Sequence, residues 1–159
     1  MRIGHGFDVH RFEADKPLML CGIHVPHPYG LQAHSDGDVA IHALCDALLG
    51  TVALGDIGQH FPDSEIKNKN RNSAEFLGEI YEMIRAAGFV LENMDLTIIA
   101  EQPKLAPHIK KMRKSLATIL ETKITKISIK ATTTEGLGFT GKDQGMAAQA
   151  VVLVRSEAN

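Results

Sequence analysis

The 159-residue sequence contains no tryptophan, two cysteines and 5% aromatic residues, and it has no run of 18 apolar residues. Without such a run, a membrane-spanning helix is not expected. Cys21 and Cys45 form no C-x-x-C pair, so we expect two buried thiols in a reducing compartment rather than a disulfide. The N-terminus shows neither the apolar core of a signal peptide nor an Arg/Ser-rich transit segment, and this favours the cytoplasm.

A strong charge of either sign is also missing, because the formal net charge is −2. Neither nucleic acid nor an anionic membrane is therefore an expected partner. The 44% hydrophobic and 23% charged residues are ordinary for a globular protein. The length fits one domain, which we place at residues 1–159.

Several well-known catalytic motifs are absent as well: the P-loop, H-E-x-x-H, G-x-S-x-G and the zinc-deaminase pattern. Residues 136–141 do spell G-x-G-x-x-G, but only 18 residues follow Gly141 and they are typical of a strand. A dinucleotide-binding unit needs a helix, another strand and an acidic residue about 20 positions further on. We interpret this match as accidental.

The apolar pattern predicts eight elements in the order β-β-α-α-β-α-β-β. The strands fall at 2–12, 17–25 (which a break could divide), 93–100, 124–131 and 146–154, and the helices at about 38–54, 73–87 and 103–121. Ser35 or Asp36 is expected to cap the first helix, and Ser73 the second. The fold class is α/β (α+β): a single domain with a β-sheet covered on one face by about three helices.

A possible metal site combines the first strand and the first helix. Asp8 and His10 are two residues apart, so on a strand they project from the same face. His42 lies on the predicted helix, with Asp46 one turn further on. If the helix packs over the strand, two imidazoles and one carboxylate can meet, which is a sufficient set for catalytic zinc with an open fourth position. Asp46 could support His42 or be an ordinary surface carboxylate.

Two further segments allow more than one interpretation. Residues 63–72 are almost all polar and form either a solvated mobile loop or a basic lid over a phosphate. The Thr-rich segment Ala131–Glu135 precedes Gly136 and Gly138, so its hydroxyls and backbone N–H groups could form a nest for phosphate oxygens. Glu135 then requires a hard cation such as Mg²⁺ between it and the phosphates. The alternative is a Thr-rich strand end.

Six motifs together resemble the 2-C-methyl-D-erythritol 2,4-cyclodiphosphate synthase family in order and spacing, over essentially the whole chain. They are Gly4–His10, Ala33–Asp38, Gly55–Gly58, Phe61–Asp63, Pro103–Lys104 and Ala131–Glu135. The resemblance implies a lyase of the non-mevalonate isoprenoid pathway. Such an enzyme converts 4-diphosphocytidyl-2-C-methyl-D-erythritol 2-phosphate to the 2,4-cyclodiphosphate and CMP. It further implies a homotrimer with active sites between subunits.

The resemblance also implies roles for individual residues. Asp8, His10 and His42 correspond to zinc ligands, Glu135 to a ligand of Mg²⁺ or Mn²⁺, and His34 and Thr133 to stabilisers of the transition state. The substrate-binding positions that it implies are Ser35, Asp56, Ile57, Gly58, Phe61, Asp63, Ala100, Pro103, Lys104, Leu105, Ala106, Thr132, Thr134, Phe139 and Lys142.

Three positions depart from the family pattern. Ala106 is smaller than the residue expected in the cytosine wall. Lys142 replaces a familiar Arg, exchanging a bidentate fork for a point charge, and Gln149 replaces a familiar Glu. The last two correspond to positions near the trimer axis, where some members hold an isoprenoid diphosphate. Two rival functions remain at this stage: a zinc phosphohydrolase that uses metal-bound water, and a non-catalytic nucleotide or isoprenoid-phosphate binding module.

Overall fold

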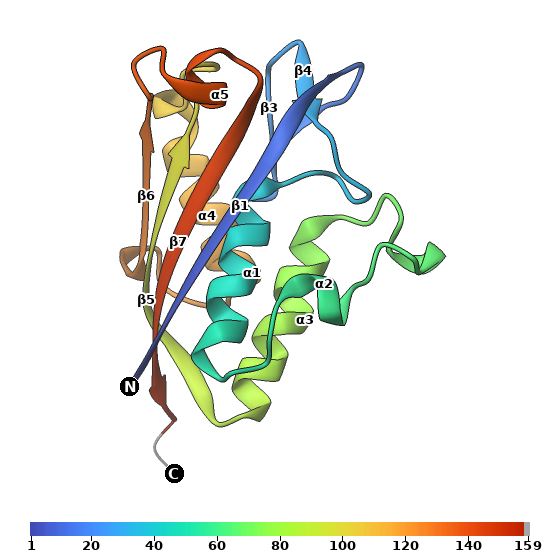
Figure 1. Ribbon diagram of the computed structural model, residues 1–159. Helices are drawn as coiled ribbons and strands as arrows, with labels where there is room; N and C mark the ends of the chain where they lie inside the picture. Colours follow the sequence, from blue (N-terminus) through green and yellow to red (C-terminus); the bar gives the residue numbers. More distant parts are fainter. Residues whose placement is uncertain (158–159) are drawn as a thin grey trace.

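A five-stranded mixed sheet, with strand order β4-β1-β7-β5-β6, forms the centre of the fold in the computed structural model, which describes residues 1–157 (Figure 1). Strand β1 is antiparallel to β4 and β7, β7 is antiparallel to β5, and β5 and β6 are parallel. A separate hairpin pairs β2 with β3. The strands are β1 Arg2–Ala14, β2 Leu18–Leu20, β3 Ile23–Val25, β4 Tyr29–Leu31, β5 Phe89–Ile99, β6 Ile127–Thr132 and β7 Gly145–Ser156.

The three longer helices lie on one face of this sheet (Figure 1). They are α1 Val39–Thr51, α3 Ser73–Ala86 and α4 Ile109–Ile119. The other helical segments are α2 Ile57–His60 and α5 Gly138–Gly141, with the 3-10 turns η1 Ile66–Asn68, η2 Ala106–His108 and η3 Ile124–Lys126. The predicted fold class, element order and one-sided helical cover are therefore confirmed. No helix within residues 1–157 is long and apolar enough to cross a bilayer.

The structure decides several predicted details at the ends of elements. The possible break in the strand at 17–25 is confirmed, because Cys21 and Gly22 take positive φ angles in a tight turn between β2 and β3, but the predicted helix caps were wrong. The cap of α1 is Asp38, which accepts a hydrogen bond from Ile41 N–H, and not Ser35 or Asp36. The cap of α3 is Asn72, so Ser73 is the first helical residue. Side chains that can cap stand next to one another here, and sequence alone does not rank them.

Helix α1 is largely buried against the sheet. Two glycines of β1 allow its backbone to approach the strand closely. A Cβ on Gly4 would lie 1.9 Å from the carbonyl oxygen of Ala47, and one on Gly6 would lie 1.9 Å from that of Ala43. Helix and strand therefore meet backbone to backbone, which only glycine at these two positions allows. Gly4 and Gly6 share their face of β1 with Asp8 and His10.

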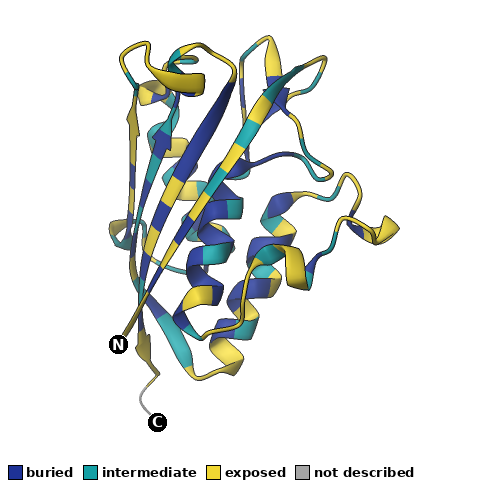
Figure 2. Cartoon of the chain, in the orientation of Figure 1, coloured by how far each residue is buried: buried dark blue, intermediate teal, exposed yellow. Residues whose placement is uncertain are grey.

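Within the described residues, no helix covers the opposite face of the sheet (Figure 1). Along β1 and β7, buried residues alternate with exposed ones (Figure 2), as expected for a sheet with one face on the core. Phe7, Val9 and Val151 are exposed on this outer face. The buried face and the helices enclose the hydrophobic core, in which Cys21 and Cys45 are free and fully buried, as predicted.

Candidate metal centre and substrate cavity

Three potential metal ligands converge where α1 crosses β1. His10 Nε2 lies 2.8 Å from Asp8 Oδ2, and His42 Nδ1 lies 3.2 Å from the same oxygen. The two ring nitrogens are 3.1 Å apart. The side chains of Asp8, His10 and His42 are only 28%, 15% and 12% exposed. The predicted meeting of strand and helix is thus confirmed, and the three donor atoms form one compact triangle.

The hydrogen bonds around His10 fix which of its nitrogens faces this triangle. His10 Nδ1 is 2.7 Å from the carbonyl oxygen of Gln32. A carbonyl oxygen only accepts, so Nδ1 carries the proton and the neutral ring directs the lone pair of Nε2 at Asp8 and His42. A ring nitrogen and a carboxylate oxygen at such short range repel each other unless a proton or a cation lies between them. The arrangement therefore fits a bound divalent metal.

The same closeness perturbs two ionisable groups. Burial acts to raise the pKa of Asp8, but the hydrogen bonds and charges of His10 and His42 outweigh it and hold that pKa well below its ordinary value. Burial acts to lower the pKa of His10, whereas the hydrogen bond and charge of Asp8 raise it overall. Both shifts favour the charged pair, in which a proton on His10 neutralises the Asp8 carboxylate. A metal cation bound between the two groups would take the place of that proton.

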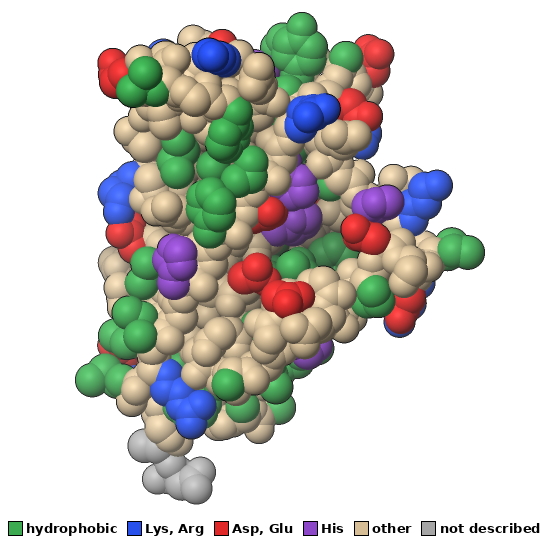
Figure 3. Space-filling view, viewed as in Figure 1, with side chains coloured by type: hydrophobic (Ala, Val, Ile, Leu, Met, Phe, Trp, Pro, Cys, Tyr) green, Lys and Arg blue, Asp and Glu red, His purple; other side chains and the backbone are tan. Residues whose placement is uncertain are grey.

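The triangle forms part of the wall of a cavity of about 750 Å³. This volume is ample for a phosphorylated small molecule. Figure 3 shows the carboxylates and histidines of this region beside the hydrophobic patch of the sheet face. The cavity is lined by Asp8, His10, Glu13, Lys16, Gln32, Ala33, His34, Ser35, His42, Asp46, Ile57, Gly58, Phe61, Pro62, Asp63, Asn68 and Phe76.

His34 and Asp63 form the outer part of this cavity. His34 Nε2 lies 3.6 Å from the Asp63 carboxylate, and both side chains are largely exposed. The predicted substrate residues Ser35, Ile57 and Gly58 line the same space. Phe61 lies deeper, where its ring packs 4.5 Å from that of Phe76.

Asp46 holds the loop that carries the Ile57 backbone. Its Oδ1 accepts a hydrogen bond of 2.8 Å from Ile57 N–H. Burial, together with the charges of Asp56 and Asp8, raises the pKa of Asp46, although this hydrogen bond opposes the shift. Asp46 is thus a half-buried group that positions the 55–58 loop. Asp56 lies outside the cavity lining and caps α2 through hydrogen bonds from Gln59.

The polar segment 63–72 is tied to the protein at its C-terminal end. Asn70 N–H donates to the carbonyl of His34 at 2.7 Å, and Asp36 N–H donates to that of Arg71 at 3.1 Å. The guanidinium of Arg71 pairs with Glu75 and Glu79, so its charge is already neutralised. Neither alternative from the sequence describes this segment fully: it is anchored beside His34, and its strongest basic group is engaged by α3.

The second group of predicted site residues lies at the carboxyl ends of the parallel strands β5 and β6. Ile99 pairs with Thr132, and Ala100 N–H donates to the Thr132 carbonyl at 3.0 Å. This brings the two segments of the group together. They contain Ala100, Pro103, Lys104, Leu105 and Ala106 on one side, and Thr132, Thr133, Thr134, Glu135, Phe139 and Lys142 on the other.

Glu101, which the sequence did not single out, organises the Thr-rich segment. Its Oε1 accepts hydrogen bonds from Thr134 N–H at 3.1 Å and Gly136 N–H at 3.3 Å. These two N–H groups point at one place, and a carboxylate of the chain occupies the position that was expected for phosphate oxygens. Thr133 Oγ1 donates to Glu135 at 2.6 Å. Residues Gly138–Gly141 form the one-turn helix α5, followed by β7, so the G-x-G-x-x-G match is accidental as predicted.

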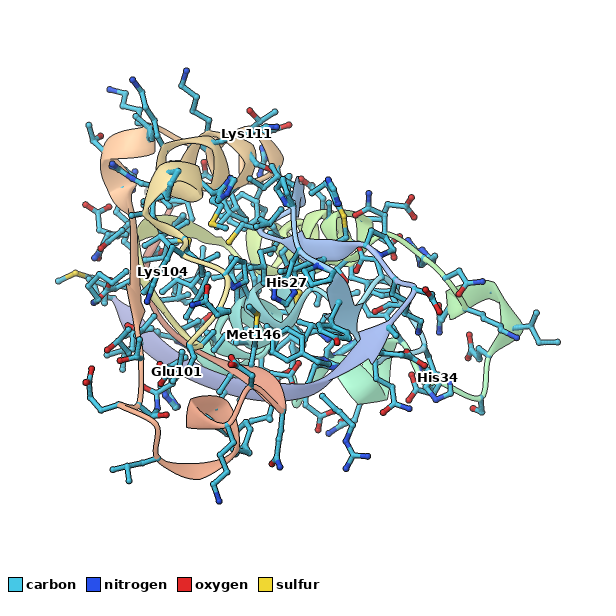
Figure 4. All side chains as sticks on the ribbon, turned by 90° about the horizontal axis from the view of Figure 1, so that it is seen from above. His27, His34, Glu101, Lys104, Lys111 and Met146 are labelled. Atoms are coloured by element: carbon cyan, nitrogen blue, oxygen red, sulfur yellow. The ribbon has the colours of Figure 1, made fainter. Side chains whose placement is uncertain are left out.

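The two groups do not meet within one chain. Viewed from above, His34 lies at one end of the molecule, while Glu101 and Lys104 lie toward the other (Figure 4). The cavity at the Asp8–His10–His42 triangle is lined by none of the residues from 100 to 142. The family resemblance implied such a division, with active sites between subunits, whereas the residue patterns alone did not. The sequence also did not identify Gln32 and Ser73, whose contacts with His10 and His42 appear only in the folded chain.

Comparison with known proteins gives consistent matches along the whole chain. The model of the YgbB family matches residues 1–155. The 2-C-methyl-D-erythritol 2,4-cyclodiphosphate synthase of Shewanella baltica is 57% identical over 154 residues, covering 97% of this chain and 96% of the relative. A CDP-bound structure of a synthase of that name has a TM-score of 0.90 at 42% identity, covering 97% of this chain and 100% of the other.

The bifunctional IspDF of Campylobacter jejuni is also similar in structure, with a TM-score of 0.94 at 44% identity. The match covers 98% of this chain but 42% of that longer protein. The likeness therefore concerns one part of the bifunctional chain.

Proposed function

This chain belongs to the YgbB family and is an enzyme of the cyclodiphosphate synthase type in isoprenoid biosynthesis, and on that basis we propose how its residues carry out the reaction. The substrate is 4-diphosphocytidyl-2-C-methyl-D-erythritol 2-phosphate. An oxygen of its 2-phosphate attacks the β-phosphorus and forms a new P–O bond. The bond from the β-phosphorus to the bridging oxygen breaks, and CMP leaves with that electron pair, so the cyclic diphosphate remains.

The substrate brings its own nucleophile in this reaction, so the protein has to position charges rather than activate a side chain. Both cysteines are buried and free, which agrees with a reaction that needs no side-chain nucleophile. Free thiols also fit a reducing compartment such as the cytoplasm. His34, beside Asp63 at the mouth of the cavity, donates to phosphate oxygens on which charge develops. Thr133 acts in the same way from the second group of residues.

The metal held by Asp8, His10 and His42 is zinc. Bond lengths of about 2.0–2.2 Å at tetrahedral angles would place neighbouring zinc ligands roughly 3.3–3.6 Å apart, somewhat more than the 2.8, 3.2 and 3.1 Å edges of the triangle. Bound there, zinc would supply a Lewis acid for a phosphate oxygen. Glu135, an exposed carboxylate, is a hard oxygen ligand suited to Mg²⁺ or Mn²⁺.

The remaining residues bind the two ends of the substrate. Ser35, the 56–58 backbone, Phe61 and Asp63 hold the erythritol phosphate portion next to the triangle. The segment Ala100–Ala106 holds the cytidine, with Lys104 at its phosphates and Ala106 leaving more room beside the base. The cytidine-binding part of the site is completed by Thr132, Thr134, Phe139 and Lys142.

The active form is a homotrimer, and each active site lies between two subunits. The separation of the two residue groups within one chain supports this, because a substrate at the triangle has to meet the cytidine-binding group of a neighbouring copy (Figure 4). The uncovered sheet face supports it too: Phe7, Val9 and Val151 are 51%, 39% and 39% exposed. Apolar surface of this extent is typical of subunit contacts. Because Lys142 and Gln149 depart from the family pattern near the trimer axis, we do not propose an isoprenoid diphosphate as a ligand there.

One experiment tests the reaction and its main rival together. The purified protein is given the substrate with zinc and Mg²⁺ in ¹⁸O-labelled water, and products are followed by ³¹P NMR and mass spectrometry. We expect the cyclic diphosphate and CMP, both free of label. Labelled product would instead indicate hydrolysis by metal-bound water, and absence of turnover with retained ligand binding would indicate a binding module. Asp8→Ala should lose zinc and turnover together.

A mixing experiment tests the shared site. His42→Ala and Thr133→Ala are each expected to be inactive alone, since each lacks one half of every site. Subunits of the two variants, unfolded and refolded together, should recover part of the activity, because some interfaces then pair two intact halves. If no activity returns although mixed trimers form, the two halves belong to one subunit.

A further inference from the structure

A chain of hydrogen bonds reaches His42 from the side opposite the metal triangle. His42 Nε2 lies 3.0 Å from Ser73 Oγ. The hydroxyl of Ser73 donates to Asp36 Oδ1, and Ser73 N–H donates to Asp36 Oδ2 at 3.1 Å. Ser73 is completely buried. Its side chain is therefore held in one orientation between a carboxylate and an imidazole.

The direction of these hydrogen bonds follows from the chemistry of the three groups. A carboxylate oxygen can only accept, so the hydroxyl proton of Ser73 is committed to Asp36. Ser73 Oγ is then available to His42 only as an acceptor. His42 Nε2 must accordingly carry a proton and donate it. In the neutral ring this leaves the lone pair on Nδ1, the nitrogen that faces Asp8 and His10.

Ser35 does not change this assignment. Its Oγ lies 3.2 Å from His42 Nε2 and accepts from Gly37 N–H at 3.3 Å. If Ser35 instead donated to an unprotonated Nε2, the lone pairs of Nε2 and Ser73 Oγ would face each other at 3.0 Å. With Nε2 protonated, both oxygens accept and no such repulsion arises.

We infer that Asp36 and Ser73 are positioning residues for the metal site: they hold His42 as the Nε2–H tautomer and so keep Nδ1 free to bind the metal. The Gln32 carbonyl has the corresponding role for His10: it holds the ring as the Nδ1–H tautomer and so keeps Nε2 free to bind the metal. Asp36 and Ser73 also join the 33–37 loop to the start of α3. Two backbone hydrogen bonds tie the same loop to the residues before α3, because Asp36 N–H donates to the Arg71 carbonyl and Asn70 N–H donates to the His34 carbonyl. Removing such a partner of a metal-bound histidine costs roughly 10–100-fold in metal affinity.

The inference rests on the proposed metal site, and zinc affinity without substrate tests it. The zinc dissociation constants of the parent protein, Ser73→Ala and Ser73→Thr are measured by competition with a chelator. We expect Ser73→Ala to bind roughly 10–100-fold more weakly, and Ser73→Thr, which keeps the hydroxyl, to stay close to the parent. Asn72→Ala is the matched control, because it removes the cap of the same helix without touching His42.

A second measurement needs no variant. ¹⁵N NMR of the zinc-free parent at about pH 8, above the pKa of about 6.5 of a free imidazole, should show His42 protonated on Nε2. Protonation on Nδ1, unchanged zinc affinity in folded Ser73→Ala, or an equal loss in Asn72→Ala would overturn the inference. A parent that binds no zinc at all would contradict the proposed metal chemistry instead, and the tautomer would still decide the role of Ser73.

Discussion

Gly6 of β1 lies directly against Ala43 of α1, with no side chain between the two backbones: a Cβ on Gly6 would lie 1.9 Å from the carbonyl oxygen of Ala43. His42 precedes Ala43 on the helix, and Asp8 follows Gly6 on the same face of the strand. The contact therefore brings His42 of the helix to Asp8 and His10 of the strand. The metal triangle depends on the absence of one methyl group.

Gly6→Ala should consequently damage both stability and the metal site. The helix has to move away from β1, and we expect a loss of about 3 kcal/mol or more in unfolding free energy together with weaker zinc binding. Urea unfolding and metal analysis measure the two effects. Gly50→Ala in the same helix is the control, since nothing lies within 4 Å of its Cβ position, and it should be neutral or slightly stabilising. Equal behaviour of the two variants would contradict this packing argument.

The pH dependence of stability should reverse when zinc is added. The lowered pKa of Asp8 contributes stability above the ordinary value of 3.8, and this is lost as the pH falls through the folded value. The raised pKa of His10 contributes stability below 6.5, and this is lost as the pH rises through the folded value. The metal-free contribution is thus greatest between these two values, and it decreases as the pH falls through the folded pKa of Asp8 or rises through that of His10. Zinc binding requires neutral histidines, so the stabilisation by zinc increases with pH.

Urea midpoints from pH 4 to 9, with chelator and with zinc, check this expectation. Asp8→Asn provides the reference, because it removes the charge that both shifts depend on while keeping the size of the side chain. Its metal-free profile should be flatter than that of the parent. Parallel profiles would show that the pair does not govern the dependence.

Glu135→Ala should separate the two cations. We expect the variant to retain zinc, because Glu135 is not part of the Asp8–His10–His42 triangle, and to need roughly tenfold more Mg²⁺ or Mn²⁺ for half-maximal activity. Titration of activity with each cation at fixed zinc provides the measurement. Glu82→Ala, which removes an exposed carboxylate of α3, is the control and should leave the cation requirement unchanged. An unchanged requirement in Glu135→Ala would refute the role of this residue.

Asp46→Ala should weaken substrate binding without removing zinc. The variant leaves Ile57 N–H without its acceptor, and a lost hydrogen bond of this kind allows the 55–58 loop to move. We expect KM to increase about tenfold, or 1.4 kcal/mol, with a smaller change in kcat. Steady-state kinetics and metal analysis provide the two readouts, and Asp46→Asn, which keeps an acceptor oxygen, should recover most of the binding. Loss of zinc from Asp46→Ala would mean that the residue supports His42 after all.

The sequence by itself determined the elements and the chemistry that they carry. Alternation along residues 2–12 placed Asp8 and His10 on one face of a strand, and helical periodicity placed His42 on the helix that follows. Local hydrogen bonding and side-chain spacing repeat every two or 3.6 residues, so these features can be deduced without coordinates.

Only the tertiary structure decided which of these parts meet. Ser73 and Asp36 lie 37 residues apart, and nothing in either segment predicts that they join behind His42. Three other features were also decided by the tertiary structure: the capping roles of Asp38 and Asn72, the link from Asp46 to Ile57, and the distance between the triangle and the Thr133 segment. Such contacts arise when the whole apolar surface is buried at once, and that packing is a property of the entire chain rather than of any local pattern.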